Sequence, residues 1–197
     1  MDNSATGKKN SSEKKDEEIV RLIQSGRTGL FDILMERYEK KIVRYARKFL
    51  ADNEEIMDVI QDIFLKVYEN IQSFDTKKKF STWLYRIAHN ELVNVLKKKK
   101  KNLVSLSLFD PDIFFPHNLR DCSLDKSINH QDMRRMIDTC LNCLEPKYRE
   151  PIVLYYFEDL SYQEIADIIQ IPIATVGIRI KRAKEKMKPI YQELKKI

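Results

Sequence analysis

The sequence predicts an all-α protein made of two small helical bundles joined by a flexible linker, with a helix-turn-helix in the C-terminal bundle. Helix breakers are rare, with only four glycines and six prolines among 197 residues. Apolar residues recur at spacings of three and four on both sides of a central stretch that lacks this pattern. The hydrophobic share of 43% is enough for two small cores.

The first bundle is predicted over residues 16–101, after a polar, disordered tail at residues 1–15. A short helix with Ile19, Leu22 and Ile23 on one face should end near Gly26. Three longer helices follow, and their apolar residues share the helical spacing. These are Phe31, Leu34, Met35, Tyr38, Ile42, Tyr45, Ala46 and Phe49; then Ile56, Val59, Ile60, Ile63, Phe64, Val67 and Ile71; then Phe80, Trp83, Leu84, Ile87, Ala88, Leu92 and Leu96.

Residues 102–130 interrupt the helical pattern with two prolines and scattered apolar side chains, so we predict a linker that lies on a partner. The second bundle is predicted over residues 131–197. It should contain a helix that begins at Pro146, a short helix capped by Ser161 and Glu164, and a last helix from Pro172 to well past Arg179.

The charge favours a polyanionic partner, because the net charge is +6 and the pI is about 9.1. Nucleic acid is the first candidate and an anionic membrane surface the second. No apolar run approaches the roughly 20 residues of a membrane span, which predicts no membrane insertion and a cytoplasmic location. The cysteines form no secreted framework, and Cys140 and Cys143 are expected to face the core.

The last two helices have the pattern of a helix-turn-helix, in which the second helix enters the major groove. Val176, Ile180 and Ala183 should face inward. The alternative is a solvated basic face, since the last helix also carries Lys184, Lys186 and Lys188. The residues predicted to read the duplex are Thr175, Gly177, Ile178, Arg179, Lys181 and Arg182.

The fourth helix of the first bundle combines aromatic residues with a following basic run. Tyr85 and Arg86 precede Lys97 and its lysine neighbours. Basic side chains bind phosphates and aromatic rings stack on unpaired bases, so this pattern suits a melted strand. Trp83 is instead expected in the core or at an interface.

Two sets of motifs resemble the sigma-70 family, in its small extracytoplasmic-function branch. Asp58-Val-Ile-Gln61-Asp62-Ile-Phe64 and Phe80-Ser-Thr-Trp-Leu-Tyr-Arg-Ile-Ala-His-Asn90 resemble the second conserved region. Leu160-Ser-Tyr-Gln-Glu-Ile-Ala166, Pro172-Ile-Ala-Thr-Val176 and Arg179-Ile-Lys-Arg-Ala183 resemble the fourth. The likeness covers residues 16–100 and 133–194 in the order that the family requires, which implies a transcription initiation factor.

The resemblance implies specific roles for residues of the first bundle. Asp58, Gln61, Asp62 and Phe64 correspond to the segment that docks on the β′ clamp helices of core RNA polymerase. The loop at residues 73–79, with Phe74, Asp75 and Lys77, corresponds to the pocket for a flipped non-template base. Asn90 and Asn94 correspond to positions that face the minus-ten element.

The second bundle is implied to bind the β flap and the minus-thirty-five element. Gly177 and Ile178 stand where the family often has a basic residue and a serine, so the upstream sequence cannot be transferred from relatives. Promoter DNA and core polymerase are the implied partners, and an anti-sigma factor is compatible with the family.

Two other classes compete with this interpretation. A stand-alone helix-turn-helix regulator explains the second bundle but gives no reason for Asp58, Gln61 and Asp62. A helical scaffold or membrane-surface protein predicts no helix-turn-helix at all. We predict no enzymatic activity, cofactor or metal, because the three histidines are scattered and the sequence has no glycine-rich phosphate loop.

Overall fold

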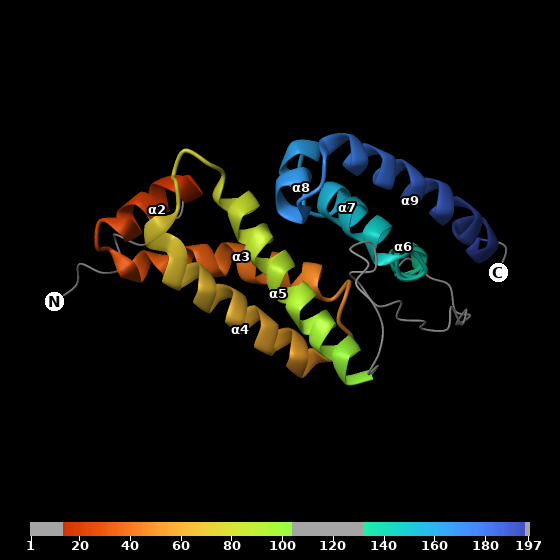
Figure 1. Ribbon diagram of the computed structural model, residues 1–197, viewed down its shortest axis with the longest axis horizontal. Helices are drawn as coiled ribbons and strands as arrows, with labels where there is room; N and C mark the ends of the chain where they lie inside the picture. Colours follow the sequence, from red (N-terminus) through yellow and green to blue (C-terminus); the bar gives the residue numbers. More distant parts are fainter. Residues whose placement is uncertain (1–13, 104–131, 196–197) are drawn as a thin grey trace. The chain divides into compact units, whose positions relative to one another are not determined.

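The computed structural model describes residues 14–103 and 132–195, which are helical apart from turns and short connections (Figure 1). The chain divides into two compact units between Leu92 and Val93, which lie within one long helix, and this helix is described whole with the first unit. The predicted fold class is confirmed, and the C-terminal unit contains the predicted helix-turn-helix. The predicted tail and nearly all of the predicted linker lie outside the described residues.

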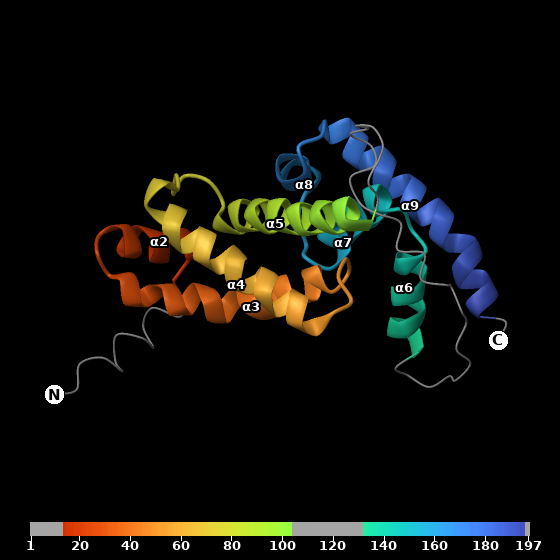
Figure 2. The ribbon, with the colours of Figure 1, turned by 60° about the horizontal axis from the view of Figure 1, so that its bottom comes forward.

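Within residues 14–103, the first unit contains four α-helices and two short 3-10 turns, and Figure 2 shows the helices side by side. Gly26, with a φ of 103°, follows the first helix and allows the chain to turn. The Asp52 side chain accepts hydrogen bonds from the backbone amides of Glu54 and Glu55 and so caps the N-terminus of helix α4. The elements are α2 (Asp16–Gln24), η1 (Thr28–Leu30), α3 (Phe31–Ala46), α4 (Asn53–Asn70), η2 (Ile71–Ser73) and α5 (Phe80–Leu103).

The apolar stripes of these helices share one core, as the spacing predicts. Aromatic side chains cross between helices: Tyr45 meets Tyr85 and Tyr38 meets Phe80, with ring centroids 5.5 and 5.6 Å apart. At the edge of the core, Lys66 of α4 donates a 2.6 Å hydrogen bond to Glu91 of α5. The largest fully buried side chains, in which α5 is well represented, are Tyr45, Tyr85, Phe80, Ile19, Ile23, Leu34, Ile42, Ile56, Ile63, Ile71, Leu84 and Leu92.

The second unit contains α6 (Asp132–Asn142), α7 (Pro146–Tyr156), α8 (Tyr162–Ile169) and α9 (Ile173–Leu194). The long α9 packs against the other three helices. The predicted capping box is present: Ser161 Oγ accepts from the Glu164 amide, and the Glu164 carboxylate accepts from the Ser161 amide. Gln170 ends α8 in the left-handed conformation, with a φ of 55°, and Pro172 precedes α9.

Cys140 lies in α6 and Cys143 directly follows this helix, and the two cysteines differ in their surroundings. Cys140 is buried, as expected, and burial raises the pKa of its thiol. Cys143 is only half-buried and is disulfide-bonded, so the expectation of a core thiol fails for this residue.

Arg149 is a buried cation that closes the end of α6. Its Nη2 donates to the carbonyl oxygens of Asn142 and Leu144, at 2.7 and 3.0 Å. Asn142 is the last residue of α6, where carbonyls lack partners within the helix, and Leu144 lies in the turn that follows. The residue is only 7% exposed, so this contact is largely sheltered from water.

Arg149→Met should therefore destabilise the second unit by about 1–3 kcal/mol, because two sheltered carbonyls lose a charged donor. The measurement is urea unfolding followed by far-ultraviolet circular dichroism. Trp83, the only tryptophan, belongs to the first unit, and its fluorescence transition should not move. Arg134→Met, at an exposed position of α6, is the control. Equal stability of the two variants would contradict the capping role.

Candidate functional site

One face of α4 is exposed and combines acidic with apolar side chains. Asp58, Gln61 and Asp62 all lie on it and are exposed, as their spacing predicts. Three large apolar residues share this face: Met57, Leu65 and Tyr68, with exposed fractions of 53%, 54% and 47%. Exposed apolar groups beside charges are typical of protein-binding surfaces. We call these six residues the α4 face.

Phe64 does not belong to the α4 face, contrary to the sequence prediction. Its side chain is 5% exposed and lies in the core, so it supports α4 from beneath and is not available to a partner. Sequence reasoning missed Met57, Leu65 and Tyr68. Their helical spacing from Gln61 would have placed them on the same face.

The loop between η2 and α5 exposes charged side chains, and aromatic side chains pack beneath it. Asp75 and Lys77 are exposed, and Asp75 Oδ1 accepts a 3.0 Å hydrogen bond from the Lys77 amide. Phe74, predicted to contact DNA, is 6% exposed. Its ring lies 4.9 Å from that of half-buried Trp83 and 5.9 Å from that of Phe80. The surface of the loop is therefore polar, and Phe74 serves as its anchor.

A polar stripe follows the outer side of α5. Arg86, Asn90, Asn94 and Lys97 are exposed, and their spacing of four, four and three residues places them along one side of the helix. Tyr85, predicted to join them, is only 2% exposed and packs on Tyr45. The α5 stripe thus offers amides and cations, with no exposed Tyr85 ring for stacking.

The helix-turn-helix places its predicted residues in two environments. Val176, Ile180 and Ala183 are 0%, 1% and 0% exposed, which confirms the inward face. Lys181 and Arg182 are exposed, and Thr175, Gly177 and Arg179 are half-buried.

Two exposed isoleucines bring apolar contacts to the same end of α9. Ile178 is 51% exposed, and so is Ile173, at 48%, which sequence reasoning missed. Gly177 lies against α8, because a Cβ there would be 3.5 Å from the Tyr162 ring.

The lysines further along α9 are held against α7. Lys184 Nζ lies 5.0 Å from the centre of the Tyr156 ring, and its hydrogen bond with Tyr156 raises the pKa of the lysine. Lys186 lies 5.4 Å from the Tyr148 ring and 3.5 Å from a carboxylate oxygen of Glu145. Burial raises the pKa of Glu145, but Lys147 and Lys186 outweigh it and hold that pKa below its ordinary value. Lys181 and Arg182 are the exposed basic residues nearest the start of α9.

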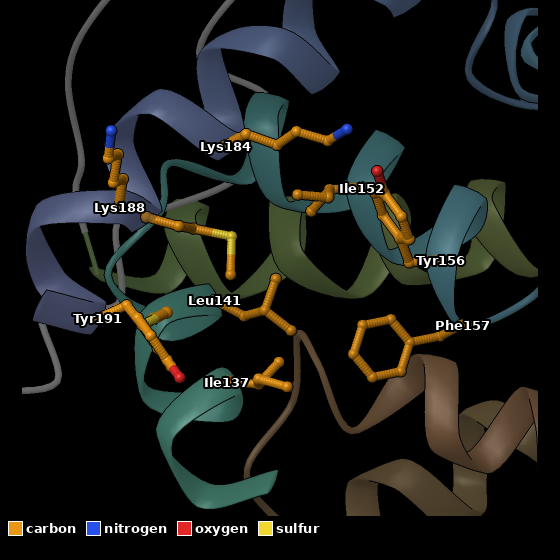
Figure 3. A pocket seen from close by; sticks show the side chains of 10 residues that line it. Ile137, Leu141, Ile152, Tyr156, Phe157, Lys184, Lys188 and Tyr191 are labelled. Carbon is orange, nitrogen blue, oxygen red and sulfur yellow. The ribbon is translucent and has the colours of Figure 1, made fainter. Parts of the chain in front are cut away.

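An apolar groove of about 500 Å³ opens between α6, α7 and α9 (Figure 3). Ile137 and Leu141 face Ile152 and Phe157 across it, and the Lys188 ammonium group points away from these side chains. This groove was not anticipated from the sequence. Its full lining is Ile137, Cys140, Leu141, Ile152, Tyr156, Phe157, Lys184, Met187, Lys188 and Tyr191.

Within the described residues, no helix is long and apolar enough to cross a membrane. The same part of the chain holds no group of histidine, cysteine or acidic side chains arranged for a metal ion.

Comparison with known families matches each unit separately. Residues 34–102 match the family model described as Sigma-70 region 2. Residues 134–187 match the one described as Sigma-70, region 4.

Curated proteins match over nearly the whole chain. RNA polymerase sigma-H factor of Pseudomonas aeruginosa is 31% identical, over 92% of this chain and 96% of its own. ECF RNA polymerase sigma factor SigW of Bacillus subtilis is 31% identical, over 89% and 96%. ECF RNA polymerase sigma-E factor of Haemophilus influenzae is 31% identical, over 91% and 96%.

Two solved structures share the fold. CnrH, in complex with the cytosolic domain of CnrY, superimposes with a TM-score of 0.66 at 23% identity, covering 91% of this chain and 99% of that one. The sigma factor RpoE from Bartonella quintana, in complex with the anti-sigma factor NepR, has a TM-score of 0.63 at 21% identity, covering 82% and 96%.

The placement of Phe64 and Leu65 predicts opposite effects of two adjacent substitutions. Phe64→Ala should cost about 3–5 kcal/mol of stability, because it leaves a cavity in the core. Leu65→Ala should change stability by less than about 0.5 kcal/mol, because the side chain is already in water. Urea unfolding followed by Trp83 fluorescence measures both. Similar losses for the two variants would mean that the α4 face is wrongly assigned.

Proposed function

The chain belongs to the sigma-70 family, as an RNA polymerase sigma factor of the extracytoplasmic-function type, and from this premise we propose that its two units divide promoter recognition between them. Such a factor directs core polymerase to promoters and starts transcription, and it is not an enzyme. We assign duplex reading to the second unit and capture of the melted strand to the first. The observation that carries this division is the exposed α5 stripe of Arg86, Asn90, Asn94 and Lys97.

Opening a promoter exposes unpaired bases, and the α5 stripe has the groups to bind them. Asn90 and Asn94 each offer an amide donor and an acceptor, and Arg86 and Lys97 supply charge for the phosphates. The loop at residues 73–79 leads directly into α5 and exposes Asp75 and Lys77. We therefore assign the minus-ten strand to the α5 stripe and the flipped base to the polar surface of this loop.

The minus-thirty-five duplex is assigned to the N-terminal half of α9. Lys181 and Arg182 provide the exposed cations, and Ile173 and Ile178 provide apolar contacts of the kind that thymine methyl groups accept. Thr175, Gly177 and Arg179 are half-buried, with Gly177 against the Tyr162 ring of α8, and we assign them to backbone contact or support.

Two surfaces are assigned to core polymerase. The α4 face supplies acids and apolar groups for the β′ clamp helices, with Asp58 and Asp62 giving the charge complementarity. The apolar groove of the second unit is assigned to the β flap, since an apolar groove between helices accepts an amphipathic segment.

We also infer that an anti-sigma factor holds the protein inactive in the cytoplasm. CnrH and RpoE share the fold, and each was solved in complex with a protein partner, an anti-sigma factor in the case of RpoE.

Run-off transcription tests the proposed function as a whole. Purified core polymerase is given genomic fragments, including the chain's own upstream region, with and without the protein. We expect specific transcripts only when the protein is present. Tight DNA binding without any transcript would favour a stand-alone regulator.

Charge reversal tests the docking assignment. Asp58→Arg together with Asp62→Arg should weaken binding to core polymerase by a few kcal/mol, because two acids are replaced by repelling cations. Glu36→Arg, at an exposed position of α3, is the matched control. Co-purification measures binding, and circular dichroism checks the fold. Unchanged co-purification of the double variant would refute the assignment.

Alanine substitutions should separate duplex binding from opening. Lys181→Ala and Arg182→Ala should each weaken upstream duplex binding by about 1–3 kcal/mol if they contact a base edge, and leave opening intact on a pre-melted template. Asn90→Ala and Asn94→Ala should leave duplex binding intact and reduce opening. Gel shift and permanganate reactivity of unpaired thymines measure the two steps. Normal opening by the asparagine variants would contradict the division of roles.

A further inference from the structure

Helix α2 lies beside the loop that connects η2 to α5 and holds it through three side chains (Figures 1 and 2). We propose that Glu17, Arg21 and Gln24 are positioning residues for the capture of an unpaired promoter base. They act by fixing the shape of the loop before DNA arrives. This inference rests on the proposed role of the loop in base capture.

The three side chains come from one face of α2, since they are spaced by four and three residues. Gln24 lies at the end of the helix and is half-buried, and its side-chain nitrogen donates to the carbonyl oxygens of Ile71 and Phe74, at 2.8 and 2.9 Å. Ile71 is the first residue of η2, and Phe74 directly follows η2, where the loop begins.

Arg21 and Glu17 hold the rest of the loop. Arg21 Nε donates a 3.1 Å hydrogen bond to Thr76 Oγ1, and Nη2 lies 3.4 Å from the Thr76 carbonyl oxygen. Glu17 Oε1 accepts a 2.9 Å hydrogen bond from the Phe80 amide. Phe80 is the first residue of α5, where amides lack acceptors within the helix and a carboxylate is favourable. One helix face thus contacts the beginning, the middle and the end of the loop.

Helix α2 can act as a brace because it is itself fixed to the bundle. Ile19, Val20 and Ile23 are fully buried. At its first residue, Asp16 accepts hydrogen bonds from Arg37 and from the Tyr38 hydroxyl. Burial and the bond to Asp16 raise the pKa of Tyr38 far above its ordinary value, so the hydroxyl stays a donor at every working pH.

The consequence falls on Asp75, the exposed acid of the loop. Both of its neighbours are held by α2: the Phe74 carbonyl by Gln24, and Thr76 by Arg21. Asp75 is therefore presented in one orientation, and its carboxylate is further fixed by the Lys77 amide. A loop ordered in advance does not lose that freedom when a base binds, which favours capture.

The test uses holoenzyme made with Gln24→Glu, which keeps the size of the side chain but removes its donor. Glu18→Gln, on the exposed face of the same helix, is the control. Opening on linear promoter DNA, read by permanganate, should fall by about fivefold to tenfold, as expected for the loss of one or two ordering hydrogen bonds. Binding to core polymerase and to the upstream duplex should match the control.

A second pair of variants keeps the inference testable if Gln24→Glu misfolds. Thr76→Val removes the side-chain half of the contact with Arg21, and Arg21→Ala removes the whole contact, so each should reduce opening and the double variant should be no worse than Arg21→Ala alone. Additive losses, or an equal loss of duplex and core binding, would overturn the inference.

The loop variant Asp75→Ala separates this inference from the proposed function. If Asp75→Ala and Asn90→Ala open promoters normally, the assignment of base capture to the first unit is wrong. If those two lose opening while Gln24→Glu opens like the wild type, the brace alone is refuted.

Discussion

The structure of the first unit depends on α5, which must bury one side and expose the other. Phe80, Leu84 and Leu92 enter the core and are at most 1% exposed, which fixes the rotation of the helix about its axis. Because that rotation is fixed, Asn90 and Asn94 lie on the exposed side of the helix. The core therefore sets the direction in which the polar stripe meets a ligand.

In the second unit, burial of one side of α9 fixes the rotation of this helix in the same way. Val176, Ile180 and Ala183 are buried, so Lys181 and Arg182 are turned to solvent. The aromatic side chains of α7 lie beside two further lysines of α9, Tyr156 beside Lys184 and Tyr148 beside Lys186. In both units, packing therefore decides which polar and basic side chains of the long helix face solvent.

Periodicity and capping signals were sufficient to predict the helices, the two bundles, the capping box at Ser161 and the inward face of α9. These signals predicted the residues of the candidate site less well. Phe64 and Tyr85 were assigned to binding surfaces but are buried, because a motif marks a segment and not the side of the helix that each residue occupies. The contact between Gln24 and Phe74 joins residues 50 positions apart, and local patterns carry no information on such pairs. The apolar groove is formed by three helices, α6, α7 and α9, and hydrophobic periodicity within one helix cannot predict how three helices meet.

The central claim is that each unit meets a different form of promoter DNA. Photocrosslinking in the open complex tests it most directly, with a photoreactive thymine placed either in the unpaired minus-ten strand or in the minus-thirty-five duplex. The account predicts that the unpaired probe crosslinks to residues 73–97, that the duplex probe crosslinks to residues 173–182, and that the first crosslink disappears when opening is blocked by cold. Crosslinks of the unpaired probe to the second unit, or a minus-ten crosslink that persists on closed duplex, would contradict it.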